Sequence, residues 1–555
     1  MKKTTVFLAF VFMSSFAQKG LVSSNAMVVS ARKEASEIGA AIMQKGGNAF
    51  DAMAATELAL AVCFPNAGNI SGGGFMVYRL NNGEIGALDY REKAPLKASQ
   101  GMYLDSKGNV IPNLSVDGAL AVGVPGTVAG IFAAHEKFGK LSIEEIMLPV
   151  IALAKKGVIV TQKQEKRLAK HHDDIIKISG PNTLFSKHYK EGDTIKYNAI
   201  AQTLTRIMKN GKDEFYKGET AQKIVSFIQK NGGIISMEDL EKYEVKWRKP
   251  ITFNYNDLKI ISMSPPSSGG ITLAQIMKMI SPYDVSKLGH NSEKYIQLLV
   301  EAERRAYADR NFFLGDPDFV LIPKNNLIDS TYLKNRMNDF SWKQASKSSD
   351  INHGKMSIYE SNETTHYAIV DSFGNAVSVT TTLNGTFGSK LFSDELGFFF
   401  NNQMDDFSSK PGVPNLYGLI GAKANEIASE KRMLSSMTPT IVEKNNQLYM
   451  VLGSPGGSTI ITSVLQTILN VNEFNMTMQE AVNQPRFHHQ WMPDEIWIET
   501  AGFSSKLLQN LLQKGYSINK EKNPVIGKVD AILILPNKKL EGGADHRGDD
   551  SAVGF

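Results

Sequence analysis

The stretch Glu363-Thr364-Thr365-His366-Tyr367 lies where the character of the chain changes. An acidic, polar run precedes it, and residues 367–380 predict a strand hairpin with a turn at 371–375. Thr364 is therefore expected between an exposed loop and a buried strand. If the chain were cut before Thr364, its hydroxyl and the new α-amine would place nucleophile and base on one residue. Taken alone, the stretch favours an ordinary pair of β-forming threonines at a strand start.

The segment before this stretch has an unusual composition. Residues 341–362 are rich in Ser, Lys and Asp and contain few apolar positions. A segment of this kind cannot bury enough apolar surface to order itself. It predicts a mobile tail or linker that ends directly at Glu363-Thr364.

Length and composition describe a large globular protein. The 555 residues exceed what one core usually supports, so two or more lobes or one large layered domain are expected. The composition is 42% hydrophobic and 21% charged, which is ordinary for globular proteins. The net charge of +5 is small for this length, and no long Lys/Arg run is present, so nucleic acid is not an expected partner.

The N-terminus predicts export. Lys2 and Lys3 precede an apolar run at 6–16, and Ser15-Phe16-Ala17 is a small-x-small ending. This is the pattern of a secretory signal peptide, residues 1–17, cleaved after Ala17. The apolar run is too short for a stable membrane anchor. A periplasmic or secreted protein without a membrane anchor is expected.

Cys63 is the only cysteine, so no internal disulfide can form. It lies within the apolar run 58–64, which predicts a buried structural thiol. No CxxC or HExxH spacing is present, and no metal is expected.

Two glycine-rich stretches stand out. Gly72-Gly73-Gly74 opens a predicted strand, and glycines there permit a close backbone approach. A phosphate loop would need a following helix and a Gly-Lys-Ser/Thr ending, which are missing. Residues 453–458 connect a strand to a helix, where glycine amides suit an oxyanion or form a plain turn. Arg91, at a strand end, could clamp a carboxylate or pair with Glu92 on the surface.

The remaining chain alternates helices and strands before residue 364 and is richer in strands afterwards. A capping box at Ser142 begins one helix, and another begins near 236–239. His488-His489 has no accompanying serine or cysteine nucleophile motif and predicts a packing role. Further elements are expected at 26–30 (strand), 34–60 (helix, interrupted near 46–51), 271–280 and 295–308 (helices), 448–452 (strand) and 459–469 (helix).

Several motifs in order resemble those of the γ-glutamyltranspeptidases, a family of N-terminal-nucleophile hydrolases. They span nearly all of the chain after the signal peptide, and the ordered set is specific although no single motif is. The matching stretches are Gly68-Asn69-Ile70-Ser71-Gly72-Gly73-Gly74-Phe75, Asp89-Tyr90-Arg91-Glu92-Lys93-Ala94-Pro95, Glu363-Thr364-Thr365-His366-Tyr367, Asn401-Asn402-Gln403-Met404-Asp405-Asp406-Phe407, Ser435-Ser436-Met437-Thr438-Pro439, Gly453-Ser454-Pro455-Gly456-Gly457, Pro485-Arg486-Phe487-His488-His489 and Asp545-His546-Arg547-Gly548-Asp549-Asp550.

The resemblance implies an α+β fold, a four-layer αββα sandwich made as one precursor. It implies self-cleavage between Glu363 and Thr364 into a large subunit, 18–363, and a small subunit, 364–555, that stay together as one intertwined domain. In the precursor, the Thr364 hydroxyl would attack the Glu363 carbonyl.

The resemblance also implies the residues of the mature site. Thr364 would be the nucleophile and its α-amine the base, with Thr382 orienting the hydroxyl and the Gly456 and Gly457 amides stabilising the oxyanion. The substrate α-carboxylate would bind Arg91, Ser435 and Ser436, and the α-ammonium would bind Asn384, Gln403 and Asp406. Residues 411–421 resemble the family's lid, with Tyr417 over the substrate. No cofactor is implied.

The implied substrates are glutathione and other γ-glutamyl compounds, with water, amino acids or dipeptides as acceptors. A related cephalosporin or glutaryl acylase would not need the full set of ammonium acceptors. A poly-γ-glutamate hydrolase would favour an open groove without a lid. An unprocessed binding protein is the non-enzymatic alternative, which the intact Thr364, Thr382 and Gly456-Gly457 disfavour.

Overall fold

The computed structural model describes residues 20–354, 365–410, 413, 415, 423–519 and 525–555. The predicted signal peptide, the predicted cleavage site Glu363-Thr364 and the predicted lid residue Tyr417 lie outside these residues.

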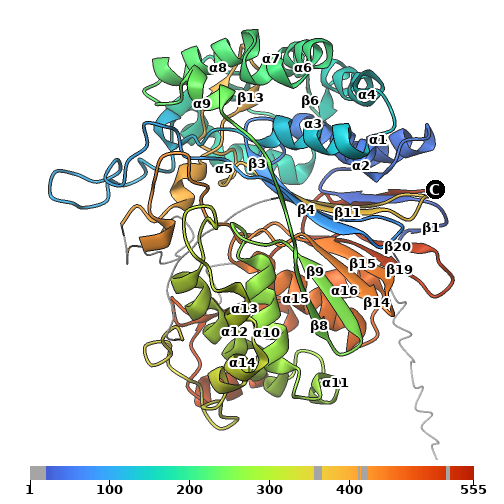
Figure 1. Cartoon of the computed structure of the whole chain (residues 1–555), viewed down its shortest axis with the longest axis vertical. Coiled ribbons are helices and arrows are strands. Elements are labelled where there is room, and N and C mark those ends of the chain that lie inside the picture. Colours follow the sequence, from blue (N-terminus) through green and yellow to red (C-terminus); the bar gives the residue numbers. More distant parts are fainter. Residues whose placement is uncertain (1–19, 355–364, 411–412, 414, 416–422, 520–524) are drawn as a thin grey trace, which may run out of the picture.

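Two antiparallel sheets of seven strands each lie face to face (Figure 1). In strand order, the β10 sheet contains β21 (Ser551–Gly554), β2 (Met27–Ser30), β10 (Thr365–Val370), β11 (Ala376–Thr382), β3 (Gly73–Arg79), β4 (Ile85–Tyr90) and β7 (Lys246–Arg248). The β15 sheet contains β1 (Val22–Ser23), β20 (Leu540–Gly543), β19 (Asp530–Ile534), β15 (Gln447–Gly453), β14 (Thr440–Lys444), β9 (Leu258–Ser262) and β8 (Ile251–Tyr255). Shorter strands are β5 (Val158–Ile159) with β6 (Thr194–Ile195), β12 (Phe392–Ser393) with β13 (Phe398–Phe399), and β16 (Phe487–His488) with β17 (Ile496–Ile498) and β18 (Ile518–Asn519).

The side chains of β10 alternate between the two faces of its sheet, so this strand contributes to two apolar clusters. Ala368 and Val370 belong to the apolar cluster between the two sheets, whereas Tyr367 and Ile369 belong to the cluster beneath the helices. Successive side chains of a strand point to opposite faces, so both faces of β10 are buried. The Tyr367 hydroxyl donates to the Glu57 carboxylate in the helical layer at 2.5 Å.

Helices cover the outer face of each sheet (Figure 1). The β10 sheet is covered by a layer containing α1 (Lys33–Gln44), α2 (Ala49–Cys63), α3 (Thr127–Phe138), α4 (Ile143–Lys156), α5 (Gln162–Ser179), α6 (Asn198–Asn210), α7 (Lys212–Tyr216), α8 (Glu219–Lys230) and α9 (Met237–Glu241). The β15 sheet is covered by a layer containing α10 (Gly269–Ile280), α11 (Val285–Leu288), α12 (Glu293–Phe313), α13 (Lys324–Leu327), α14 (Ser330–Arg336), α15 (Thr459–Asn472), α16 (Met478–Asn483) and α17 (Ser505–Gln513). The four layers confirm the predicted αββα sandwich.

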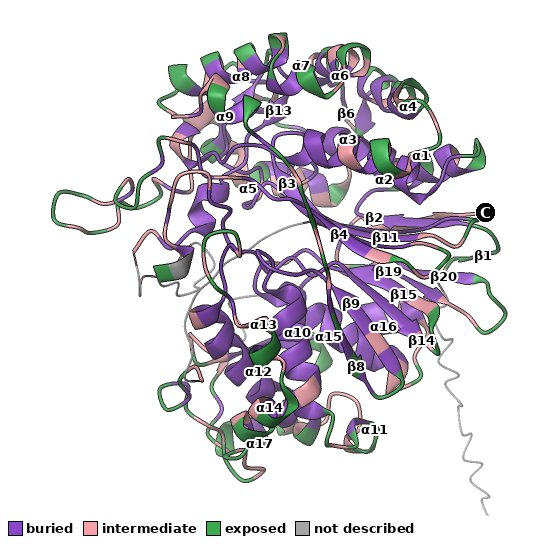
Figure 2. Cartoon of the chain, in the orientation of Figure 1, coloured by how far each residue is buried: buried purple, intermediate pink, exposed green. Residues whose placement is uncertain are grey.

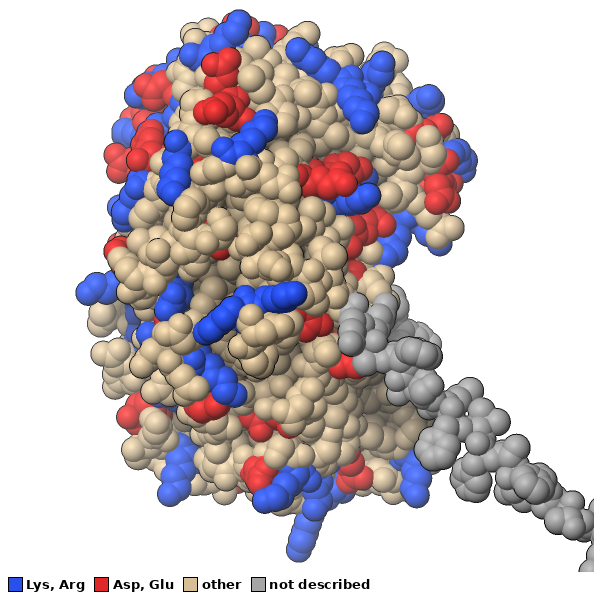
Figure 3. All heavy atoms as spheres, turned by 90° about the vertical axis from the view of Figure 1, so that its right-hand side faces the viewer, with Lys and Arg blue, Asp and Glu red and all other residues tan. Residues whose placement is uncertain are grey.

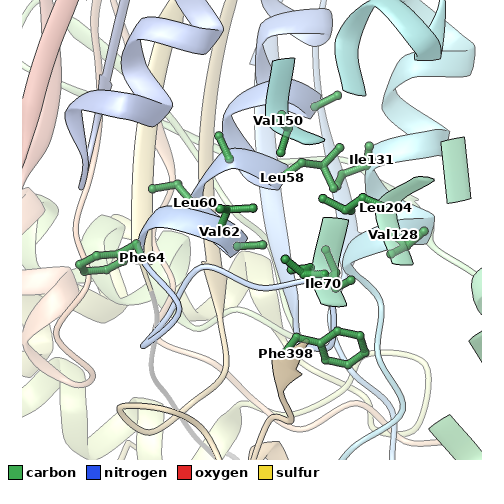
Figure 4. Packing of buried hydrophobic residues seen from close by; sticks show 14 of the residues in the cluster. Leu58, Leu60, Val62, Phe64, Ile70, Val128, Ile131, Val150, Leu204 and Phe398 are labelled. Carbon is green, nitrogen blue, oxygen red and sulfur yellow. The ribbon is translucent and has the colours of Figure 1, made fainter. Parts of the chain in front are cut away.

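The central helices and both sheets are buried, while exposed residues collect on the outer helices and loops (Figure 2). Every residue of α2 is buried, as its Ala-rich sequence permits. In Figure 4, Leu58 of this helix lies among Ile131, Val150 and Leu204 from three other helices, whereas Phe64 at its end lies apart from them.

Local sequence patterns predicted the break between α1 and α2 and the start of α4. The predicted interruption near 46–51 separates α1 from α2, and Asn48 forms a capping box with Asp51. Ser142 forms the predicted capping box with Glu145 at the start of α4. Cys63 is buried, and burial raises the pKa of its thiol to about 12.

One prediction about the linker is wrong. Residues 341–354 are packed against the rest of the fold. The Trp491 indole donates to the Ser348 and Ile351 carbonyl oxygens at 3.0 and 2.8 Å, and Ser348 is fully buried. The prediction of mobility rested on the composition of the segment alone. It failed because the residues that hold the segment in place, such as Trp491, lie far along the chain. The remaining residues of the predicted linker, 355–362, lie outside the described residues.

The surface carries charges of both signs. Lys and Arg side chains are interspersed with Asp and Glu over the face shown in Figure 3. Among the described residues, no helix is both long and apolar enough to cross a membrane.

Candidate active site

The site is built around the ends of β10 and β11. Thr365, the first described residue after the gap, pairs with Thr381, and the next residue, Thr382, pairs with Gly73 of β3. The Thr382 Oγ1 accepts a hydrogen bond from the Asn384 amide at 2.6 Å. These residues are buried. The Thr381 hydroxyl donates to the Gly73 carbonyl at 3.0 Å, whereas the Thr365 hydroxyl has no hydrogen-bond partner among the described residues.

The three-glycine stretch allows β3 to approach this point. A Cβ on Gly72 would lie 1.9 Å from the Thr382 carbonyl oxygen, which only glycine avoids. The Asn69 side chain donates to the same carbonyl at 2.9 Å and accepts from the Gly72 amide and the Thr127 hydroxyl, both at 2.8 Å. Asn69 thus fixes the end of β11, a positioning role that the sequence did not reveal.

Two unpaired amides lie at the start of α15. Gly456 and Gly457 have φ values of +132° and +62°, a backbone conformation that favours glycine. Within the described part of the chain, neither amide donates a hydrogen bond. Their carbonyl groups accept hydrogen bonds from Thr459 and Ile460. The amides are available to stabilise an oxyanion, with support from the helix N-terminus.

Arg91 is fully buried beyond the end of β4. Its Nε donates to the Met433 carbonyl at 3.2 Å, and its Nη2 donates to the Leu434 carbonyl at 3.0 Å and to the Asp406 carboxylate. Its Nη1 has no hydrogen-bond partner among the described residues and lies 3.7 Å from Glu92 Oε2. The alternative of a surface ion pair is therefore wrong, and one donor of the guanidinium is available.

Asp406 connects Arg91 to the neighbouring polar residues. Gln403 Nε2 donates to Asp406 Oδ2 at 2.7 Å. Burial raises the pKa of Asp406 to about 7, although the nearby Arg91 lowers it. The buried oxygens Gln403 Oε1 and Asn384 Oδ1 accept no hydrogen bond from the part of the chain that the structure describes. Such acceptors are costly to leave unfilled, so the site is suited to a donor from a ligand.

The serine pair is held from two sides. Ser435 Oγ accepts from the Met437 amide at 3.1 Å, and its carbonyl accepts from the Ser268 amide and hydroxyl. Ser436 Oγ accepts from Arg310 Nη2 at 2.6 Å. Arg310 is buried on α12 and also donates to Ser268 Oγ at 2.9 Å.

Sequence analysis missed two charged groups of the site. Arg310 has no motif around it, and only its contact with Ser436 reveals its place. Glu92 is fully buried, and neither of its carboxylate oxygens accepts a hydrogen bond from a described residue. Burial raises the pKa of its carboxyl to about 8. His488, as predicted, packs inside the fold, with Nδ1 2.9 Å from the Thr462 hydroxyl.

A cavity of about 210 Å³, here called the Phe64 cavity, opens beside these strand ends. Its lining residues are Phe64, Asn66, Ala67, Arg167, Thr365, Asn384, Gly385, Thr386, Pro455, Gly456 and Lys528. Among the described residues, no group of three or more His, Cys, Asp or Glu side chains is placed to hold a metal ion.

Two facing sheets between helical layers, with a threonine-rich strand start beside unpaired glycine amides, match the N-terminal-nucleophile class of hydrolases. Residues 35–555 match the profile of the gamma-glutamyltranspeptidase family, and the chain belongs to this family.

Relatives and a solved structure agree. The glutathione hydrolase proenzyme of Escherichia coli (strain K12) is 44% identical over 534 residues, which cover 95% of this chain and 92% of that protein. The acylase ACY 1 proenzyme of Pseudomonas sp. (strain V22) is 32% identical over 546 residues, which cover 97% and 94%. A crystal structure of Helicobacter pylori gamma-glutamyltranspeptidase has a TM-score of 0.58 and 44% identity, covering 62% of this chain and 97% of that one.

Proposed function

We propose that this protein is a self-cleaving γ-glutamyltransferase and glutathione hydrolase whose nucleophile is Thr364. Its family and its 44% identity to a glutathione hydrolase proenzyme support this activity. The observation that carries it is one buried site with an unfilled donor, Arg91 Nη1, and unfilled acceptors, Gln403 Oε1 and Asn384 Oδ1. An α-amino acid head group supplies the complementary carboxylate and ammonium.

Maturation cuts the chain into residues 18–363 and 364–555. The Thr364 Oγ attacks the Glu363 carbonyl carbon, the peptide C–N bond breaks, and the nitrogen becomes the free α-amine of Thr364. Water then hydrolyses the resulting ester, which leaves Glu363 with a carboxylate. The solved Helicobacter pylori chain covers only 62% of this sequence, but 97% of that chain is matched. A chain of this length is compatible with a separate large subunit.

Catalysis repeats the same chemistry on the substrate. The Thr364 Oγ attacks the γ-carbonyl carbon of a γ-glutamyl amide while the α-amine takes the hydroxyl proton. The Gly456 and Gly457 amides stabilise the oxyanion, and Thr382 orients the nucleophile. The leaving amine accepts the proton, and water or the amine of an amino acid or peptide then takes the acyl group from the ester.

The head-group pocket holds the glutamyl part. Its α-carboxylate binds Arg91, Ser435 and Ser436, and its α-ammonium binds Asn384, Gln403 and Asp406. Tyr417, in the segment 411–421, covers the substrate. We further propose that the signal peptide directs the protein out of the cytoplasm, to the periplasm or the medium, and that removal of the peptide leaves no membrane anchor.

An acylase is the second candidate, because a relative of that name is 32% identical over most of the chain. A glutaryl group has no α-amine, so it would leave Asp406, Gln403 and Asn384 without a ligand donor. A poly-γ-glutamate hydrolase is less favoured because the sequence contains the predicted lid, residues 411–421.

The test is denaturing electrophoresis with N-terminal sequencing, followed by hydrolysis of a γ-glutamyl anilide and the matching glutaryl anilide. We expect two chains, the smaller beginning at Thr364, and faster release from the γ-glutamyl anilide. Thr364→Ala should abolish both cleavage and activity. One uncut chain without anilide release would overturn the proposal, and preference for the glutaryl anilide would favour the acylase.

A further inference from the structure

The Phe64 cavity lies beside Thr365, the residue that follows the proposed nucleophile in the chain, and outside the proposed head-group pocket. Thr365, Asn384 and Gly456 line it, so it adjoins the reacting carbonyl. Of the head-group residues, only Asn384 takes part in its lining; Arg91, Gln403 and Asp406 do not. Once the glutamyl part fills the head-group pocket, the amine bonded to the γ-carbonyl has this cavity next to it.

Two cations stand over one aromatic ring in this cavity. Lys528 Nζ lies 5.2 Å and Arg167 Cζ 5.3 Å from the Phe64 ring centroid. Among the described residues, Lys528 Nζ makes no hydrogen bond or ion pair. The Arg167 guanidinium donates to Asn66 Oδ1 at 3.3 Å and forms no ion pair with a described residue. Most of their donors are therefore available to a ligand.

Neighbouring carboxyl groups do not cancel this charge. Asp530 and Asp550 act on Lys528 from beyond ion-pair distance. Burial raises the pKa of Asp550 to about 6 and raises that of Asp530 well above its usual range, so the pair carries less than its full negative charge near neutral pH. Asp549, which acts on Arg167, accepts a hydrogen bond from the Thr161 hydroxyl at 2.6 Å.

Burial also lowers the pKa of both Lys528 and Arg167. A partly desolvated cation without a partner is stabilised by a bound anion, and a carboxylate accepts from both a guanidinium and an ammonium. The Phe64 ring adds an apolar surface next to the two groups.

We propose that Arg167 and Lys528 bind the carboxylate of the amine partner, which is the amino acid or peptide released from the donor or accepted in transfer. This assignment rests on the proposed function and extends it to the second substrate. In γ-glutamyl amides of amino acids and peptides, the carbonyl-bound nitrogen belongs to a residue that bears a carboxylate a few bonds away. The class selected is therefore α-amino acids and short peptides with a free C-terminal carboxylate.

The wild-type enzyme provides the first test, with a γ-glutamyl anilide as donor and glycylglycine or glycylglycinamide as acceptor. The two acceptors differ in the terminal carboxylate. A hydrogen bond to a charged group corresponds to about tenfold or more in affinity, so the KM of glycylglycine should be lower by about that factor. Equal KM values would overturn the assignment even if every variant failed to fold.

Lys528→Met and Arg167→Met provide the second test. Each should reduce the ratio of the two acceptor KM values by several-fold. Lys187→Met is the matched control, because Lys187 Nζ stands 5.3 Å from the Tyr189 ring centroid and Lys187 does not line the cavity. This control should keep the wild-type ratio. An unchanged ratio in both cavity variants would overturn the assignment.

A donor comparison separates the leaving group from the acceptor. Hydrolysis of glutathione and of its glycine ethyl ester, without added acceptor, should show a higher kcat/KM for the free acid, and Lys528→Met should reduce that difference. Equal values would limit the carboxylate site to acceptors and overturn its role for the leaving group. Complete absence of anilide release by the wild type would overturn the proposed function itself, whereas release without carboxylate selectivity overturns only this inference.

Discussion

Arg91, in the proposed head-group pocket, and Lys528, in the Phe64 cavity, are both cations, yet the fold holds them differently. Arg91 is fully buried and shares Asp406, Met433 and Leu434 as partners. Lys528 is half-buried and, among described residues, makes only a contact with the Phe64 ring through its ammonium. A buried charged group that is held by several hydrogen bonds can bind a ligand in one geometry only. A partly exposed charged group without such hydrogen bonds can bind ligands in several geometries. The head-group pocket should be strict, and the Phe64 cavity permissive.

The largest expected effect follows from Asp406→Asn. Removing one charge of a buried pair costs about 2–5 kcal/mol, or roughly 30- to 4,000-fold in kcat/KM for a γ-glutamyl anilide. Hydrolysis of glutaryl anilide, which lacks the α-ammonium, should fall much less in the same variant. Circular dichroism confirms that the variant is folded. An equal loss with both donors would mean that Asp406 only supports Arg91.

Arg91→Lys should have the next largest effect. Lysine retains the charge but loses the planar fork that reaches two carbonyl groups and a carboxylate at once, and a loss of roughly 30- to 100-fold in kcat/KM is expected. Arg79→Lys is the matched control, since Arg79 is a buried arginine that pairs with Glu443 in a different part of the sheet. Wild-type kinetics in Arg91→Lys would contradict the proposal that the guanidinium, fixed by its hydrogen bonds, binds the substrate α-carboxylate.

A smaller effect should appear in the pH profile. The ammonium requires an ionised Asp406, and burial raises the pKa of this carboxyl to about 7. The carboxylate is present above that value and is lost as pH falls through it, so kcat/KM for γ-glutamyl anilide should decline below about pH 7. The Thr364 α-amine affects both donors alike. The ratio of γ-glutamyl to glutaryl activity therefore isolates Asp406, and a pH-independent ratio would contradict this role.

The smallest effect is expected from Phe64→Leu. This change keeps an apolar side chain but removes the ring beneath the two cations, which corresponds to about 0.5–1 kcal/mol, or roughly a two- to fivefold higher KM for glycylglycine. The KM of the γ-glutamyl donor should stay the same, which a parallel donor titration checks. A larger change in the KM of the donor than in the KM of glycylglycine would contradict the separation of the head-group pocket from the Phe64 cavity.

Local patterns predicted the elements, but long-range pairing could not be predicted from them. The capping boxes at Asn48 and Ser142 depend on residues three apart, and the hairpin 367–380 on a short turn. Neither Arg310 with Ser436 nor Trp491 with Ser348 has a local sequence signature, because each contact joins segments that only the folded sheets bring together.

The same limit applies within the candidate site. Ordered motifs predicted Arg91 and Asp406 as ligands for opposite charges of one head group. Their direct pairing, across 315 positions of sequence, appears only in three dimensions. Burial likewise cannot be seen in a motif, and it raises the pKa values of both Asp406 and Glu92.

The most direct test of the central claim is mass spectrometry of purified protein mixed with a γ-glutamyl donor and quenched in acid. We predict a small chain that begins at Thr364 and carries one γ-glutamyl group as an ester on that residue. An uncut chain, or a γ-glutamyl group on any residue other than Thr364, would contradict the account.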